Sequence, residues 1–154
     1  MKILRILRPM AIVFCAGFIL AWAPGFPALA PPPPLAKITL AGGKIGIDKS
    51  EVSASRRQSL VWWIENHYED EKAVELTNFQ IGTMSGDECT DLKKMNQPPL
   101  RGRLEDRKVE GAENGEPGTG IIAVVVKKDA DETCYKYDIT ATGLPDLDPR
   151  LHVR

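Results

Sequence analysis

The chain has few side chains that could act in catalysis or bind a metal, and its two histidines are the first candidates. His67 lies in the polar run Asn-His-Tyr-Glu-Asp-Glu at positions 66–71, where acidic neighbours could join an imidazole around a metal ion. We favour an exposed hairpin loop for this run and keep His67 as the alternative metal candidate. His152 falls in a predicted last strand or tail, where we do not expect it to bind a metal.

The cysteines favour a structural disulfide. Of the three, Cys15 lies in an N-terminal segment that we expect to be removed, which leaves Cys89 and Cys134. An even count in an exported chain is typical of a disulfide framework. Metal binding or redox chemistry by two thiols is the alternative, but the pair lies 45 positions apart with no Cys-x-x-Cys motif. We therefore predict one disulfide between Cys89 and Cys134.

Two further motifs resemble functional sites without meeting their requirements. The acidic run Asp-Ala-Asp-Glu at 129–132 lacks the length, the glycine and the distant glutamate of an EF-hand loop, so we predict a solvated turn rather than a calcium site. Gly-Thr-Met-Ser-Gly at 82–86 is not a nucleophile elbow, which needs serine at its central position. We predict no catalytic residue, no cofactor and no enzymatic activity.

Residues 1–30 have the layout of a secretory signal peptide. A basic start precedes an uncharged apolar run at 10–23. At about 1.5 Å per residue this run is too short for a permanent transmembrane helix. We expect cleavage after Ala30 or, alternatively, after Gly25, and a polyproline stub at 31–34. The sequence thus predicts a periplasmic or extracellular protein without a permanent membrane span.

Residues 35–154 have the length of one domain. The whole chain is 43% hydrophobic and 27% charged, which is typical of a globular protein and excludes collagen, coiled coil and wholesale disorder. After residue 30 the chain carries 17 Lys and Arg against 21 Asp and Glu, a net charge of −4. Because it also lacks a basic stripe, the sequence argues against nucleic acid as a partner.

Short runs rich in β-branched and aromatic residues recur between turn signals, and no long stretch keeps a helical period. This pattern predicts an all-β domain, a single antiparallel Greek-key β-sandwich, cupredoxin-like or immunoglobulin-like, with one disulfide. The predicted strands cover positions 36–40, 44–47, 59–65, 72–79, 120–128, 134–142 and 151–154.

Three of these strands predict which side chains are buried. In 134–142 the odd positions are apolar, which indicates one buried face. The run at 121–126 is apolar throughout, which predicts a central strand covered on both sides. In 59–65, Trp62 and Trp63 must face opposite ways, so one fills the core. The other is covered by the chain itself or forms a contact surface.

A long loop is predicted at 82–120, where strand signals are weak apart from a short edge strand at Val109. Structureless segments of this length are uncommon in compact domains and are either functional or disordered. The predicted disulfide would fix the first part of the loop and leave positions 113–118 mobile.

Three segments together resemble small secreted bacterial proteins of the cupredoxin-like β-sandwich fold. They are Leu-Val-Trp-Trp-Ile-Glu-Asn at 60–66, Val-Glu-Leu-Thr-Asn-Phe at 74–79, and Tyr-Lys-Tyr-Asp-Ile-Thr-Ala-Thr-Gly at 135–143 with Leu-Asp-Pro at 147–149. The resemblance implies a sandwich and, in that family, a copper site of two His, one Cys and an axial Met. Residues 140–144, where the family's ligand loop would begin, contain no such ligand. The resemblance therefore supports the fold and counts against the copper site.

Two hypotheses about function follow from these patterns. The first is an exported, non-enzymatic module that binds a protein or a cell-envelope component through one sheet face or through the loop at 82–120, with Trp62 or Trp63 in the contact surface. The alternative is a degenerate cupredoxin-like protein that binds copper or zinc through His67, nearby acids, Met84 or Met95.

Overall fold

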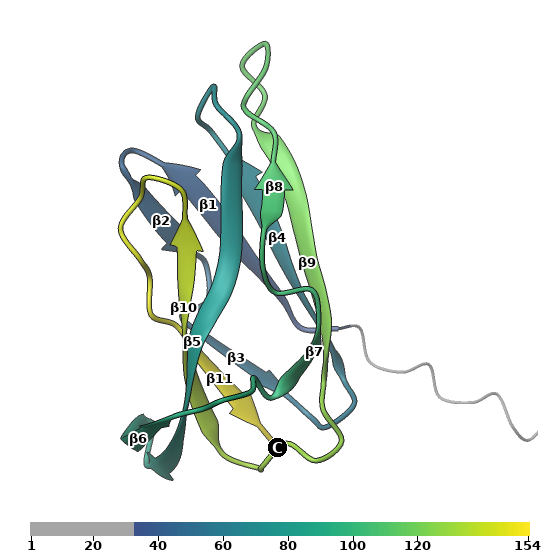
Figure 1. The fold of residues 1–154 in the computed structure, drawn as a ribbon, viewed down its shortest axis with the longest axis vertical. Helices are drawn as coiled ribbons and strands as arrows, with labels where there is room; N and C mark the ends of the chain where they lie inside the picture. The colour runs from purple at the N-terminus through teal and green to yellow at the C-terminus, as the bar shows by residue number, and fades with distance from the viewer. Residues whose placement is uncertain (1–32) are drawn as a thin grey trace, which may run out of the picture. The chain divides into compact units, whose positions relative to one another are not determined.

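The computed structural model describes residues 33–154, and the predicted signal peptide, its cleavage sites and Cys15 lie outside the described residues. This part of the chain consists of β-strands joined by turns, and nothing helical in it could cross a membrane (Figure 1). The strands are β1 (Leu35–Ala41), β2 (Lys44–Ile47), β3 (Glu51–Ala54), β4 (Ser59–Asn66), β5 (Lys72–Ser85), β6 (Glu88–Lys94), β7 (Leu100–Gly102), β8 (Arg107–Val109), β9 (Gly118–Val126), β10 (Cys134–Ala141) and β11 (Arg150–Val153).

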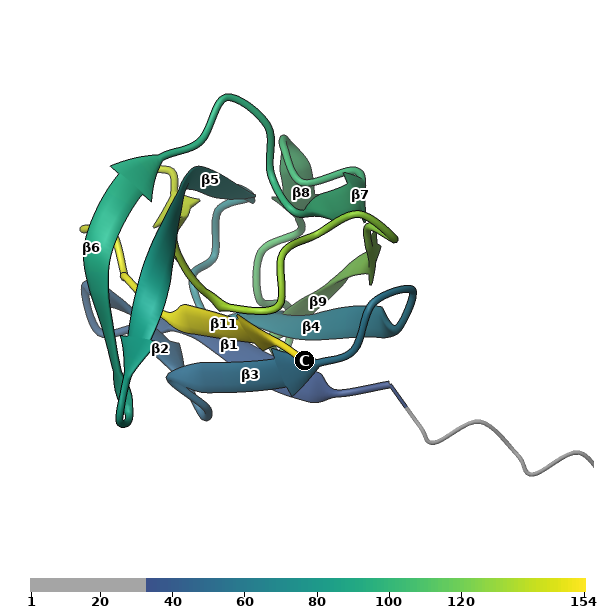
Figure 2. The ribbon, with the colours of Figure 1, turned by 90° about the horizontal axis from the view of Figure 1, so that it is seen from below.

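The strands form two sheets around one hydrophobic core. Sheet A has the order β2-β1-β4-β9-β7, and sheet B has the order β3-β11-β10-β5-β6, with β8 also paired to β5. Figure 2 shows β5 and β6 on one side of the molecule and β4, β7 and β9 on the other. Buried residues of both sheets belong to the same core cluster. The predicted all-β fold with two sheets and one disulfide is confirmed.

Both sheets are mixed, which differs from the purely antiparallel prediction. β1 pairs with β4 in parallel, and β3 pairs with β11 in parallel. Parallel neighbours need a crossover connection, and here β2 and β3 lie between β1 and β4 along the chain. The alternation of apolar residues shows which face of a strand is buried, but it does not show the direction of the neighbouring strand.

The prediction that residues 82–120 form a long loop with few strands is wrong. β5 continues to Ser85, β6, β7 and β8 follow, and β9 begins at Gly118. The short edge strand predicted at Val109 is confirmed as β8. β6 was not predicted because most of its side chains are exposed, so its sequence lacks the apolar alternation that indicates a strand.

The core is aromatic at its centre, where it connects the two sheets. Trp62 of β4 meets Tyr137 of β10 edge to face, with ring centroids 6.0 Å apart, and its Nε1–H donates a hydrogen bond to Tyr137 Oη at 3.2 Å. Phe79 of β5 stacks on the same tyrosine with centroids 5.4 Å apart. Such pairs stabilise a core beyond the area that they bury. Burial raises the pKa of Tyr137 well above its usual range, so its hydroxyl stays protonated.

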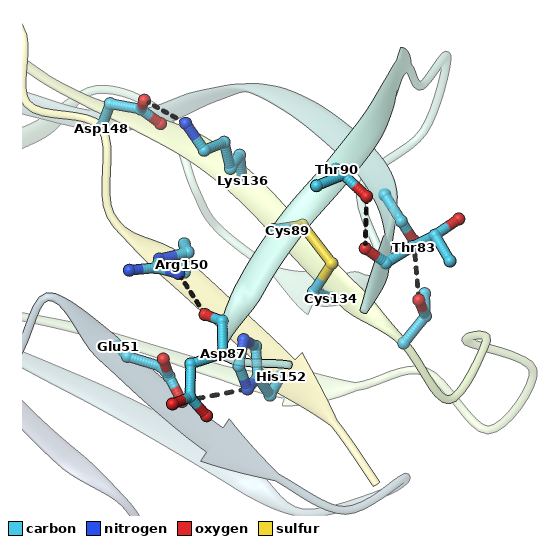
Figure 3. Close-up of a disulfide and its surroundings, with 12 residues drawn as sticks. Glu51, Thr83, Asp87, Cys89, Thr90, Cys134, Lys136, Asp148, Arg150 and His152 are labelled. Atoms are coloured by element: carbon cyan, nitrogen blue, oxygen red, sulfur yellow. Dashed lines mark hydrogen bonds and ion pairs between the residues drawn. A yellow bond between two sulfur atoms is a disulfide. The ribbon is translucent and has the colours of Figure 1, made fainter. Parts of the chain in front are cut away.

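The disulfide joins Cys89 of β6 to Cys134 of β10, the two strands that flank β5 in sheet B (Figure 3). Gly82 of β5 lies next to the disulfide. A Cβ atom there would lie 2.6 Å from Cys89 Sγ and 2.7 Å from the carbonyl oxygen of Thr90. Only glycine permits so close an approach, because it has no side chain.

A buried asparagine holds two neighbouring turns together, the β4–β5 and β8–β9 turns, which are uppermost in Figure 1. Asn66 ends β4 and is fully buried. Its Nδ2 donates to the carbonyl oxygens of Asp70, Val109 and Glu110 at 2.9, 3.3 and 3.0 Å, and its Oδ1 accepts the N–H of Tyr68 at 3.1 Å. The asparagine therefore replaces, for both turns, the backbone pairing that a sheet would supply.

Candidate functional site

The outer side of β9 is open to solvent, so the prediction that the run at 121–126 is covered on both sides is wrong. Buried and exposed residues alternate along the strand. Ile122 and Val124 face the core, whereas Ile121 and Val125 are 41% and 39% exposed. A continuous apolar run indicates a central strand, but it cannot show whether another part of the chain covers the second face.

The two tryptophans face opposite ways, as predicted. Trp62 is 1% exposed and belongs to the core, so it is excluded from any contact surface. Trp63 is half-buried on the outer side of sheet A, between Lys37 of β1 and Ile121 of β9. Of the predicted pair, only Trp63 can meet a partner.

Trp63 belongs to an apolar surface that extends over three strands. Val61 lies between Leu35 of β1 and Ala123 of β9 in one cross-strand row, and Trp63 pairs with Ile121 in the next. Cross-strand partners point to the same side of a sheet and lie within contact distance. We call the outer surface made by these side chains and Val125 the apolar face; its members are Leu35, Val61, Trp63, Ile121, Ala123 and Val125.

The apolar face holds most of the exposed apolar bulk in residues 33–154. Leu35, at its margin, is 49% exposed. The large hydrophobic side chains classed as exposed in this part of the chain are Leu35, Ile121 and Val125 on the face, and Met84 and Leu92 on the β5–β6 hairpin. Contiguous apolar surface of this kind, unlike a scattered leucine, is a candidate site of interaction.

Four cations gather at one end of the apolar face. Arg101 of β7 pairs directly with Val125 of β9 and so points to the same side of the sheet. A pocket of about 370 Å³ opens there, lined by Val125, Val126, Asp129 and the cations Arg57, Arg101, Lys127 and Lys128. None of these cations forms an ion pair with an acid in residues 33–154. We call this group of four the cationic corner.

The acid next to the apolar face is neutralised. Lys37 Nζ lies 2.7 Å from Glu65 Oε2, and His67 Nε2 lies 3.5 Å from the same oxygen. The hydrogen bond from Lys37 holds the pKa of Glu65 below its usual range, so the carboxylate stays ionised and paired. His67 is 44% exposed in the turn after β4, as expected for a loop residue.

The residues predicted for an alternative metal site are not brought together. His67 lies near the start of β5 and Met84 near its end, and the twelve positions from Lys72 to Met84 span about 40 Å at ~3.3 Å per residue. Met95 lies between these ends, where its N–H donates to the carbonyl of Phe79. Across residues 33–154 there is no group of three or more His, Cys, Asp or Glu side chains that could hold a metal ion.

His152 has a more specific setting than the sequence suggested. It lies in β11 and is buried next to the turn of the β5–β6 hairpin (Figure 3). Its Nδ1 is 3.0 Å from Glu51 Oε1. Nε2 is covered and has no hydrogen-bond partner in the described part of the chain. With Met84 and Glu132, the residue lines a pocket of about 360 Å³.

The two other motifs adopt the expected ordinary structures. Residues 129–132 form the turn between β9 and β10, where Arg56 Nε donates to the carbonyl of Ala130 at 2.6 Å and Arg56 Nη1 pairs with Glu132 at 3.3 Å. Residues 82–86 form the end of β5 and the start of a turn into another strand. A nucleophile elbow would need a turn into a helix.

A scan against protein-family models finds no match for this chain, and a search of curated proteins finds none either. The cupredoxin-like relationship therefore stays a prediction from the sequence segments.

Proposed function

We propose that the protein is an exported, non-enzymatic module that binds a protein or cell-envelope component through its apolar face. The observation that carries this proposal is the outer side of β9, where Ile121, Ala123 and Val125 occupy successive outward positions of a strand inside a sheet. Outer sheet positions in water are normally polar. Three apolar residues in a row, next to Trp63, are typical of an interface.

Export is supported by two independent features. The signal-peptide layout of residues 1–30 addresses the chain to a membrane-crossing route. The disulfide between Cys89 and Cys134 is of the kind that persists in oxidising compartments.

The sheet edges are less suited to binding than the apolar face. β2 and β3, at one edge of each sheet, have only four residues each. β6, at the other edge of sheet B, carries Glu88, Asp91, Lys93 and Lys94. Short or charged edge strands prevent strand addition. The apolar face, in contrast, lies on hydrogen-bonded strands, so its side chains lose little conformational freedom on binding.

The proposal is tested by placing a photo-crosslinking amino acid at Ile121 in the protein expressed in its own host. Leu92 on β6 serves as the matched control, because it is also an exposed large apolar residue but belongs to the other sheet. We expect illumination to give a discrete adduct from position 121 that the substitution Val125→Ser diminishes. Equal adducts from both positions, or none from position 121, would contradict the proposal.

A further inference from the structure

The apolar face and the cationic corner adjoin each other, and together they indicate one class of partner. We propose that these two surfaces dock the protein on the anionic surface of a lipid membrane. This inference rests on the proposed function, for which it names the partner.

The distribution of charge supports an anionic partner. The chain after residue 30 has a net charge of −4, so an anionic membrane repels it as a whole. The cationic corner carries four positive charges against one acid, Asp129, and the acid on the opposite side of the apolar face, Glu65, is paired with Lys37. Attraction therefore acts only when the protein turns the cationic corner, and with it the apolar face, toward the lipid.

The side chains of the apolar face suit a lipid interface. Leu35, Ile121 and Val125 project from a sheet, and Trp63 lies among them. Binding energy at protein partners is concentrated in anchors that fill fitted pockets. A membrane needs no such fit, because acyl chains adapt to the side chains, and tryptophan favours the boundary between headgroups and hydrocarbon.

The path of the chain places this surface near a membrane during export. The face includes Leu35, the first residue of β1, and the apolar run of the predicted signal peptide ends at Ala23, twelve positions earlier. Twelve positions span at most about 42 Å at ~3.5 Å per residue, so in the export that we propose the face comes close to a membrane.

The experiment uses the exported form of the chain, with its N-terminus established by mass spectrometry. Binding is measured by co-sedimentation with two kinds of vesicle, phosphatidylcholine alone and phosphatidylcholine mixed with phosphatidylglycerol. After residue 30 the only tryptophans are Trp62, which is buried, and Trp63. A blue shift of the emission, together with quenching by brominated acyl chains, therefore reports on Trp63 and on the orientation of the bound protein.

Paired variants separate the charged and apolar contributions. Arg101→Ala with Lys127→Ala should lower the partition into anionic vesicles about 25-fold, about fivefold for each charge. Lys93→Ala with Lys94→Ala, on β6, removes the same charge from the other sheet and should change it little. Ile121→Ser should lower partition about tenfold, because an isoleucine side chain no longer enters the lipid.

The matching apolar control is Leu92→Ser, for which we expect no change in partition. Partition into both kinds of vesicle to the same extent, or equal losses in the face and control variants, would overturn the membrane proposal. Absence of vesicle binding together with an adduct from position 121 on a host protein would overturn it too, yet leave the proposed binding function intact. Absence of both would refute the two proposals together.

Discussion

Replacing Asn66 tests the claim that one buried side chain holds two turns together. In Asn66→Ala the carbonyl of Val109, which is buried, loses its side-chain donor, and those of Asp70 and Glu110 lose theirs in partly buried positions. Leaving a buried polar group unpaired costs about 1–3 kcal/mol. Because the two other carbonyls can still reach water, we expect the free energy of unfolding to fall by about 3 kcal/mol in total.

Asn66→Asp keeps the shape and removes the donor, and the result should depend on pH. A carboxylate at this position would face three carbonyl oxygens while buried, so its pKa in the folded protein must lie above the unfolded value. The neutral form is then favoured by folding. The variant should be most stable in acid and lose stability as pH rises through the unfolded pKa, until the folded pKa is passed. At pH 7 we expect a loss of about 3–5 kcal/mol, as for other unpaired buried charges.

Urea denaturation followed by tryptophan fluorescence at acidic and neutral pH measures both variants against the wild type. Asn96→Asp, on the surface, is the matched control and should change the free energy of unfolding by less than about 0.5 kcal/mol. Hydrogen exchange of the Ala112 amide, which donates to the carbonyl of Tyr68, should accelerate in both Asn66 variants. If Asn66→Asp were as stable as the wild type at pH 7, the donor role of Asn66 would be wrong.

Three further outcomes are expected. Cys89→Ala opens a link between residues 45 positions apart and should lower the free energy of unfolding by about 4 kcal/mol in urea titrations, whereas reductant should leave the variant unaffected. Gly82→Ala should cost about 1–3 kcal/mol, and only part of that in the Cys89→Ala background, where the clash with the carbonyl oxygen of Thr90 remains; no cost in the wild-type background would contradict the close approach. Glu65→Gln should destabilise at neutral pH only. Because the ion pair with Lys37 lowers the folded pKa of Glu65, its contribution is lost as pH falls through that pKa, and a pH-independent difference would refute this.

The sequence predicts those features of the fold that depend on alternation along a strand. Tyr135, Tyr137 and Ile139 alternate with polar residues and are all buried in β10. The opposite directions of Trp62 and Trp63 follow from the same geometry. The disulfide follows from the cysteine count and the expected compartment.

The candidate surface could be predicted only in part, because it depends on what lies beside each strand. The run at 121–126 shows that β9 is apolar. Only the fold shows that no other segment of residues 33–154 covers the outer side of this strand. Arg101 meets Val125 through the pairing of β7 with β9, which no local pattern in this polar region indicates. His152 is buried because the β5–β6 hairpin reaches it, and β6 itself has no apolar alternation.

The parallel pairing of β3 with β11 also sets the order in which the molecule can be completed. Glu51 lies opposite Arg150, so an early strand acquires its neighbour only after 99 further residues have been made. At about 5–20 residues per second, β3 waits roughly 5–20 s during synthesis. Until then sheet B lacks β11, the strand that joins β3 to β10, and Leu151 and Val153 are missing from the core. In the export that we propose, a chain that has not yet closed its second sheet can still pass through a translocation channel in an extended state.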